Sequence, residues 1–493
     1  MAANGTTHSE QNGESKVSTP SVIPLQINGQ DVQSDVTFDV INPSTGEVIW
    51  KCSSVSKDNA IKAVEAAQAA FPKWSKTKQD ERRDIMLRAA DIMKRRHDEL
   101  FKYCAEETAT PPLMITKINI ENAVALIKDT AGRISTIQGI VPECADVGTS
   151  AIVFKEPYGV VLGIAPWNAP YILGVRAVAA AIAAGNTCVL KASELSPMCY
   201  WAIGDVFREA GLPDGVLNVI AHRPQDAAEV TTALIEHPAV KKINFTGSTL
   251  VGGIIASTAG KNLKPVVMEL GGKASTIILA DADLKKAALA CTIAAFFHSG
   301  QICMSTERIV VHSSVAEAFK AELKGTIDAV FSPQGDSTVL INPVGVKKNR
   351  RLVSQAVEKG AKILHGDVDS KESTETRLRP IVVGGVTKDM DLYYTESFGP
   401  TVSFIEVGSE EEAIALANDT DYGLSAAIFT ESLQTGLRVA KQIESGAVHI
   451  NSMTVHDEPA LPHGGVKKSG FGRFNSSTGL DEWLKTKTVT WQD

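Results

Sequence analysis

Short apolar segments alternate with longer helical ones along the middle of this chain, and this alternation restricts its fold more than any other feature. Strands are expected at 160–165, 187–190, 216–220, 242–245 and 265–269. One helix is expected at 175–184. A second is expected to start at Ser196 and Pro197, which cap it, and to end at Gly211, because Pro is typical of helix starts and Gly of helix ends. The pattern predicts an α/β fold with a parallel, doubly wound sheet that binds a nucleotide at its carboxyl edge.

The segments on either side extend this organisation. Two helical stripes precede the series, one at Ile61, Val64, Ala67 and Phe71 and one at Ile85, Ala89, Ile92 and Met93. A second β/α series follows residue 269, with a helix at 282–297, a strand at 308–312 and a helix at 313–330. A loop near a site is expected at 389–401, and a strand at 487–491. With 493 residues, the chain is long enough for two or three domains.

The composition is that of a globular protein. Apolar residues make up 44% and charged residues 22%, a balance that provides an adequate core. The net charge is −8 and no basic stripe occurs, which argues against nucleic acid and anionic membranes as partners. No segment approaches the roughly 20 apolar residues needed to span a bilayer.

The cysteines and the N-terminus indicate a cytoplasmic protein. There are seven cysteines, an odd number, without CxxC or Cys/His spacing, so neither a disulfide framework nor a metal site is predicted. Residues 1–20 are polar, lack the apolar centre of a signal peptide and lack the arginines of a transit peptide. They are predicted to form a disordered tail.

Three short segments carry candidate catalytic groups. Cys303 stands in FFHSGQICMSTE, Glu269 in MELGGK and Asn168 in PWN. A thiol, a carboxylate and an amide donor are the minimal parts of acyl chemistry through a thioester. Each residue alone has an ordinary alternative: a packed core thiol, an ion-pair residue and a turn cap.

Glycines after one predicted strand indicate a phosphate site. Gly247, Ser248 and Gly252 follow the strand at 242–245 and begin a helix, whose first N–H groups suit a pyrophosphate. The spacing differs from GxGxxG, and no Gly-Lys-Ser/Thr follows, so a kinase-type P-loop is disfavoured. The alternative is a plain strand-to-helix turn.

Charged residues after two further strands bear on cofactor choice. Lys191 and Glu194 end the strand at 187–190, where an acidic residue binds ribose hydroxyls and repels a 2′-phosphate. The alternative is an exposed charged loop. Arg223, in the loop after the next strand, suits a phosphate, so NAD is favoured while NADP stays open.

The order of these motifs resembles the NAD(P)-dependent aldehyde dehydrogenase superfamily over residues 22–490. The matching motifs are PWN (166–168), LKASE (190–194), NFTGS (244–248), MELGGK (268–273), GQIC (300–303), ESFGP (396–400) and GGVKKSGFGR (464–473). The resemblance implies a Rossmann-type cofactor domain, a second α/β catalytic domain and a small β oligomerisation flap. The expected ranges are 21–136 and 157–268 for the cofactor domain, 137–156 and 484–493 for the flap, and 269–483 for the catalytic domain. A homodimer or homotetramer is implied.

The resemblance also assigns roles. Cys303 is implied as the nucleophile, Glu269 as the general base, and the Asn168 side chain with the Cys303 backbone N–H as the oxyanion hole. The residues implied to hold the cofactor are Trp167, Lys191, Glu194, Gly247, Ser248, Glu396 and Phe398.

Two stretches, 165–177 and 451–465, are similar to the branch that acts on salicylaldehyde, vanillin and benzaldehyde. Tyr171 and Arg176 are the implied substrate-binding residues, with a structural ion pair as the alternative for Arg176. His463 stands where relatives commonly have Phe, and Phe474 where many carry a second Glu.

Other functions stay open at this point. One alternative is a dehydrogenase for an aliphatic or polyketide-derived aldehyde. Another transfers the acyl group to coenzyme A, which Glu269 disfavours because a water-activating base favours hydrolysis. A third, of another class, is a non-catalytic binding or structural protein that keeps the fold.

Overall fold

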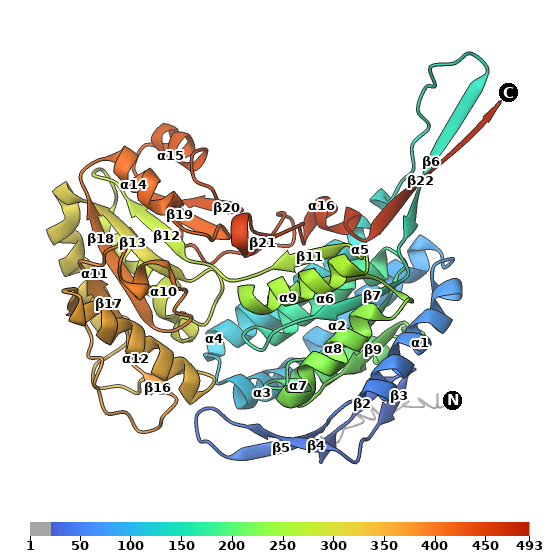
Figure 1. The fold of residues 1–493 in the computed structure, drawn as a ribbon, viewed down its shortest axis with the longest axis horizontal. Coiled ribbons are helices and arrows are strands. Elements are labelled where there is room, and N and C mark those ends of the chain that lie inside the picture. The colour runs from blue at the N-terminus through green and yellow to red at the C-terminus, as the bar shows by residue number, and fades with distance from the viewer. Residues whose placement is uncertain (1–20, 493) are drawn as a thin grey trace, which may run out of the picture.

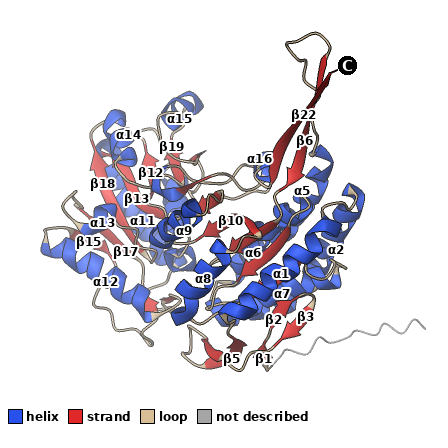
Figure 2. Cartoon of the chain, turned by 45° about the vertical axis from the view of Figure 1, so that its right-hand side comes forward, coloured by secondary structure: helices blue, strands red, loops and turns tan. Residues whose placement is uncertain are grey.

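The computed structural model describes residues 21–492 and forms two lobes with one projecting arm (Figure 1). The predicted tail at 1–20 lies outside the described residues. Each lobe is built on one large sheet covered by helices, and the arm is a pair of long strands that leaves the first lobe (Figure 2).

The first lobe contains an eight-stranded sheet whose five central strands are parallel. These are β7 (Val160–Ile164), β8 (Thr187–Lys191), β9 (Leu217–Ile220), β10 (Val240–Thr246) and β11 (Val266–Glu269). They lie in the order β11-β10-β7-β8-β9, so the strand order reverses between β7 and β10. The predicted doubly wound sheet is confirmed. Ligands of such sheets bind outside the carboxyl ends at the point of reversal.

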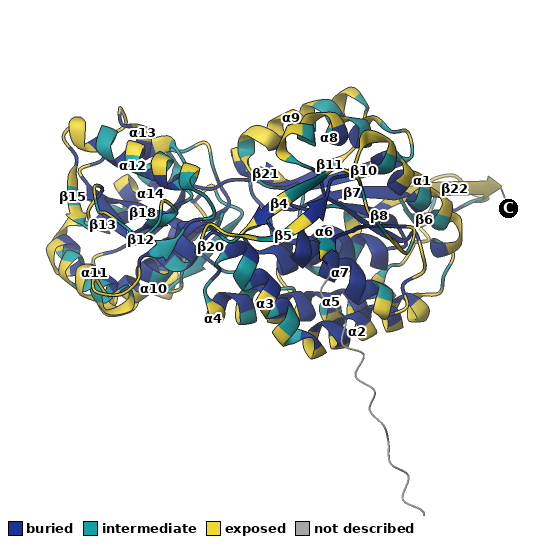
Figure 3. Ribbon diagram, turned by 90° about the horizontal axis from the view of Figure 1, so that it is seen from below, coloured by how far each residue is buried: buried dark blue, intermediate teal, exposed yellow. Residues whose placement is uncertain are grey.

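Helices cover both faces of this sheet and bury it (Figure 3). One face carries α2 (Gln79–Arg95), α5 (Asn122–Arg133), α6 (Pro170–Ala183) and α7 (Pro197–Glu209), and the other carries α1 (Lys57–Trp74), α8 (Ala227–Glu236) and α9 (Thr249–Lys261). The sequence predicted α6 to start at 175, whereas this helix begins at Pro170. Proline fits the first turn of a helix, where its missing N–H costs nothing.

The start of α7 differs from the prediction in its cap. Ser196 makes no side-chain cap hydrogen bond. Glu107, from α3 (His97–Thr108), instead accepts hydrogen bonds from the backbone N–H groups of Met198 (2.8 Å) and Cys199 (3.0 Å). Burial raises the pKa of Glu107 to about 8, although these N–H groups lower it. A cap from a distant helix leaves no local signal in the sequence.

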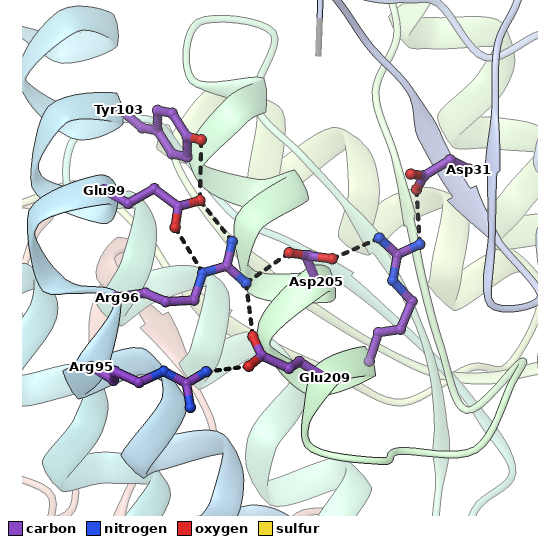
Figure 4. Close-up of polar contacts among 8 residues, drawn as sticks. Asp31, Arg95, Arg96, Glu99, Tyr103, Asp205 and Glu209 are labelled. Carbon is purple, nitrogen blue, oxygen red and sulfur yellow. Dashed lines mark hydrogen bonds and ion pairs between the residues drawn. The ribbon is translucent and has the colours of Figure 1, made fainter. Parts of the chain in front are cut away.

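An ion-pair network also ties α3 to α7 (Figure 4). The guanidinium of Arg96 donates to Asp205 at 2.7 Å and to Glu99 at 2.7 and 2.9 Å. Its side chain is 7% exposed, so the pair with Asp205 is poorly screened by solvent. The network fixes α7 against α2 and α3.

The second lobe contains a seven-stranded sheet in the order β15-β17-β18-β13-β12-β19-β20. Its strands are β12 (Ala274–Ile278), β13 (Thr306–His312), β15 (Lys362–His365), β17 (Ile381–Gly384), β18 (Thr401–Val407), β19 (Ser425–Phe429) and β20 (Ala447–Ile450). All neighbours are parallel except β15. The packed helices include α10 (Leu284–Phe296) and α11 (Ala316–Val330), the latter preceded by a 3-10 turn within the predicted 313–330 helix.

Two C-terminal strands return to the first lobe. β22 (Leu484–Gln492) pairs antiparallel with β6 (Thr149–Pro157) along the projecting arm. β21 (Gly470–Phe471) pairs antiparallel with β11 and so extends the first sheet. β21 therefore belongs to the sheet of the first lobe, although its residues fall in the 269–483 range predicted for the catalytic domain. Within 21–492, no helix combines the length and apolar character needed to cross a membrane.

Candidate active site

A cavity of about 270 Å³ lies at the carboxyl edge of the first sheet, where the strand order reverses. Both lobes line it. The predicted site residues in its wall are Trp167, Asn168, Gly247, Ser248, Glu269, Cys303, Glu396 and Phe398. Residues from five of the seven motifs thus meet in one place.

The segment before Cys303 has an unusual backbone that holds the thiol at the cavity. A short 3-10 turn (Phe297–Gly300) follows α10, and His298 and Ser299 have left-handed φ values of 50° and 57°. A Cβ at Gly300 would collide with the carbonyl oxygen of Gly399, and one at Gly272 with that of Cys303. Glycine at 300 and 272 therefore permits the close approach that GQIC and MELGGK encode.

Asn168 follows β7 and points its amide toward the same segment. Its Nδ2 donates to the carbonyl oxygen of Gln301 at 3.0 Å, and the side chain is buried. A carboxamide nitrogen carries two N–H donors, so this bond orients the group and leaves a second donor for an oxyanion. The amide thus lies next to the backbone that carries Cys303.

Glu269, the last residue of β11, is held by Arg176 from α6. Arg176 Nη2 donates to Glu269 Oε2 at 2.7 Å, and Nη1 donates to Asp457 at 3.2 Å. Burial opposes ionisation of Glu269, but the Arg176 charge and His463 outweigh it and lower its pKa to about 2. Glu269 is therefore a carboxylate at neutral pH.

The thiol of Cys303 is protonated in this arrangement. Burial, followed by the charge of Glu269 and a hydrogen bond with it, raises the thiol pKa well above its usual value. A thiolate is the reactive form, so the thiol must lose its proton as it attacks. Glu269 is the carboxylate in reach.

The loop 395–399 brings Glu396 and Phe398 to the opposite wall. Glu396 Oε1 accepts a hydrogen bond from the Gly272 N–H at 2.8 Å, and burial followed by the charge of Glu307 raises its pKa to about 7. Phe398 has a left-handed φ of 47°, and its ring lies edge-on to Trp167 at 6.0 Å.

Glu307 and Lys273 hold this loop, and neither was predicted as a site residue. Glu307 accepts hydrogen bonds from the Ser397 N–H at 2.8 Å and the Phe398 N–H at 3.1 Å, and from Lys273 Nζ at 2.6 Å. Lys273 is the last residue of MELGGK and Glu307 the last of FFHSGQICMSTE, so both stood within segments that the motifs had already singled out.

The end of the cavity at β10 fits a dinucleotide phosphate. Ser248 caps α9 through a bond from the Val251 N–H, and a Cβ at Gly247 would lie 2.5 Å from the Phe245 ring. Only glycine fits there, which brings the backbone to the cavity wall before a helix N-terminus. These features suit the NAD(P) chemistry that the motifs imply.

Lys191 ends strand β8 and Glu194 follows it, and neither is among the residues that line this cavity. Burial lowers the pKa of Lys191 against the opposing charge of Glu194. Burial, then Lys191, lowers the pKa of His222 to about 4, with Glu194 and Asp226 acting the other way. Arg223 is bound on two nitrogens by Asp226, at 2.7 and 3.0 Å. These groups thus form one charged cluster beyond the strand ends.

The two residues expected to bind substrate have other partners. Tyr171 is fully buried, and its hydroxyl donates to the carbonyl oxygen of Leu100 at 2.7 Å. Arg176 makes the ion pairs with Glu269 and Asp457, which agrees with the structural alternative for this residue. Neither lines the cavity, so substrate contact by Tyr171 and Arg176 stays a prediction without support from this geometry.

Known proteins resemble this chain over nearly its whole length. A model of the aldehyde dehydrogenase family matches residues 30–489. Vanillin dehydrogenase from Pseudomonas sp. (strain HR199 / DSM 7063) is 43% identical over 96% of this chain and 98% of its own.

Solved structures agree with this similarity. The salicylaldehyde dehydrogenase of Pseudomonas putida G7, in complex with salicylaldehyde, has a TM-score of 0.92 at 34% identity, with 96% of this chain and 99% of that one covered. An NADP dependent enzyme of E. coli has a TM-score of 0.91 at 29% identity, with 96% and 98% covered.

Proposed function

This chain belongs to the aldehyde dehydrogenase family, whose members oxidise aldehydes with NAD(P)+, and we propose that its own substrates are aromatic aldehydes and its cofactor NAD+. The observation that carries the proposal is the meeting of Cys303, Glu269 and Asn168 in one cavity beside Gly247 and Ser248. The product is the carboxylic acid.

The first half of the reaction forms a bond to sulfur. Glu269 takes the proton of the Cys303 thiol, and the sulfur adds to the aldehyde carbon. The Asn168 amide and the Cys303 backbone N–H stabilise the oxyanion, and such donors are worth about 10²–10³ in rate each. Residues 246–248, Glu396 and Phe398 would hold the dinucleotide, which when bound supplies the hydride acceptor.

The second half releases the acid. A thioester on Cys303 is attacked by water, and Glu269, once it has lost the thiol proton, takes the water proton as general base. A carboxylate with a pKa of about 2 is a weak base, so Glu269 must loosen its bond to Arg176 when it acts. Arg176 thus keeps the base ionised between turnovers.

An aromatic substrate is supported by the surroundings of Cys303 and by the relatives. Leu173 and Leu270 line the cavity together with Cys303. Next to Cys303 in the sequence, Ile302 is buried and Met304 packs against the core cluster that contains Leu173. Flat apolar rings suit such surfaces. The named relatives act on vanillin and salicylaldehyde. Oxidation of an aliphatic aldehyde is the second candidate, because an apolar wall also accepts alkyl chains.

Preference for NAD+ is supported by charge at the end of β8. The Glu194 carboxylate would repel a 2′-phosphate, and Arg223, the nearby cation suited to a phosphate, is bound by Asp226. A homodimer or homotetramer is also proposed, since Phe154, Val489 and Trp491 are exposed on the β6–β22 arm. A cytoplasmic location stays a prediction from the cysteines.

Initial rates test the proposal directly. Benzaldehyde, its hydroxy and methoxy derivatives and a series of alkanals are compared by kcat/KM with NAD+ and NADP+. Aromatic aldehydes with NAD+ are expected to be used best. Cys303→Ala should abolish turnover, while Cys144→Ala, at another half-buried cysteine, should leave it unchanged. Full activity of Cys303→Ala would remove the nucleophile from the scheme.

A further inference from the structure

His463 lies beside the catalytic carboxylate with its ring nitrogen unpaired. The His463 Nε2 atom is 3.9 Å from Glu269 Oε1, and the two side chains are 9% and 0% exposed. Neither atom has a hydrogen-bond partner among the described residues. The separation exceeds a hydrogen bond by about 1 Å, so a small movement would join the two atoms. Buried polar atoms that face each other unpaired are rare in proteins.

The proposed reaction requires a route for a proton at this point. Glu269 takes the thiol proton in the first half, so it must lose that proton before it can act as a base on water. When water then attacks the thioester, one O–H bond breaks, the oxygen bonds to the acyl carbon, and the proton goes to Glu269. The C–S bond breaks, giving the acid and the Cys303 thiolate, which takes this second proton back from Glu269 and becomes the thiol again. Glu269 is fully buried and Arg176 occupies its Oε2, which leaves Oε1 for the departure of the first proton. His463 is the base that faces this oxygen.

We propose that, in each turnover, His463 accepts the thiol proton from Glu269 before hydrolysis and delivers it toward solvent past Asp457, an inference that rests on the proposed aldehyde oxidation. His463 is thereby a positioning and relay residue, because it acts through Glu269 and does not touch the substrate.

Asp457 gives the ring the tautomer that this transfer needs. Asp457 Oδ1 lies 3.7 Å from His463 Nδ1, and its side chain is 15% exposed, against 0% for Glu269. When Glu269 carries the proton, Asp457 is the carboxylate that remains charged beside the ring, which favours N–H at Nδ1 and leaves Nε2 as an acceptor toward Glu269. A proton that enters at Nε2 therefore displaces one at Nδ1, on the side nearer to solvent.

The surrounding groups hold His463 in place. The His463 N–H donates to the Phe474 carbonyl at 2.9 Å, and the Phe474 N–H donates to the His463 carbonyl at 2.7 Å. The Phe474 ring is buried and lies 4.9 Å from the Arg176 guanidinium. Charged or titratable groups face the imidazole from four elements: Glu269 on β11, Arg176 on α6, Asp457 in its own loop and His449 on β20.

A pair of matched variants tests the relay. His463→Gln keeps a polar side chain that cannot take up a proton. The control, His456→Gln, removes a neighbouring histidine that is bound to Glu458 and is not part of the His463–Glu269 pair. We expect His463→Gln to lower steady-state kcat by about 10²-fold, the lower end for proton-transfer catalysis. The first turnover of NADH should stay within about twofold of wild type, and acid-quenched protein should carry an acyl group on Cys303. His456→Gln should behave as wild type.

Rescue by a small base distinguishes a relay from a packing role. Added imidazole should restore part of the variant's turnover. Unchanged kcat in His463→Gln, or an equal loss of the first turnover and the steady state, would overturn the relay.

Two further measurements keep the test decisive. His463→Asn replaces the first variant if that one unfolds. The wild-type rate in mixtures of H₂O and D₂O should depend on the deuterium fraction along a curve, since more than one proton moves; a straight line would contradict the relay.

The outcomes separate the relay from the proposed function. If wild type itself oxidises no aldehyde, the proposed function fails. If wild type is active and His463→Gln has the same kcat, only the relay is removed.

Discussion

Arg176 Nη2 lies 2.7 Å from Glu269 Oε2, and the two side chains are 3% and 0% exposed. The pair joins the helix after β7 to the end of β11, across the point where the strand order reverses. Breaking a buried pair by removing one partner typically costs about 3–5 kcal/mol, because a charge is left without compensation. The general base thus depends on a residue outside the cavity wall.

Replacement of Arg176 by Met should move the pH dependence of turnover. The guanidinium outweighs burial and holds the pKa of Glu269 at about 2, so its loss leaves burial to raise that pKa. The acid limb of kcat controlled by Glu269 should shift to higher pH. Arg176→Lys, which keeps a positive charge, should shift it less. Profiles of kcat against pH that superimpose for all three proteins would contradict this assignment.

The same pair should contribute to acid stability. The folded-state pKa of Glu269 is about 2, below the usual 4.5, so its contribution is fully present above pH 4.5 and is lost as the pH falls toward 2. The difference corresponds to about 3 kcal/mol. Unfolding followed by circular dichroism should show that wild type loses more stability over this window than Glu269→Gln does. Parallel losses would exclude a stabilising carboxylate.

Asn168→Ala should damage the chemical step while cofactor binding survives. Loss of one oxyanion donor lowers kcat by about 10²–10³-fold. Asn168→Asp keeps the shape but replaces the donor by an acceptor, so it should be at least as slow. NAD+ titrations followed by tryptophan fluorescence provide the control, because neither change removes a proposed cofactor contact. Near-normal kcat for Asn168→Asp would exclude an oxyanion role.

Release of Arg223 should improve the use of NADP+. Asp226 binds two nitrogens of Arg223, and removal of that carboxylate in Asp226→Ala frees the cation for a 2′-phosphate. The KM for NADP+ should fall severalfold with little change for NAD+. Asp226→Glu, which retains a carboxylate, should resemble wild type. An unchanged ratio of kcat/KM for the two cofactors would place Arg223 outside the cofactor site.

Truncation after Trp483 should affect assembly. β22 pairs along its whole length with β6, so its removal leaves β6 as an unpaired edge on the arm. The molecular mass measured by light scattering should fall to a smaller species if the arm joins subunits. A full-length protein that is already monomeric would reject the proposed oligomer.

The strands and helices of the first sheet were predictable because their signal is local. Apolar runs bounded by Gly and Pro marked β7 to β11 within a few residues, and the helix starts were less exact because Pro170 and its turn carry little periodicity. The motifs around Cys303, Glu269 and Asn168 were also local, and the structure brings them into one cavity.

Contacts between distant segments could not be predicted from the sequence. Arg176 and Glu269 are 93 residues apart, and an arginine on a helix carries no sign of its partner. The bond from Tyr171 to Leu100 and the cap of α7 by Glu107 depend in the same way on tertiary packing. Such contacts emerge only when the elements are placed in three dimensions.

The position of β21 in the chain has a consequence for the order in which the active site forms during synthesis. Gly470 pairs with Glu269, the Leu270 N–H donates to the Ser469 carbonyl at 2.9 Å, and Ser469 Oγ donates to the Gly271 carbonyl at 2.6 Å. The strand that carries the base therefore gains its outer neighbour only from residues that are translated after every strand of the second sheet. A nascent chain holds a thiol without a finished base until that sheet has been synthesised.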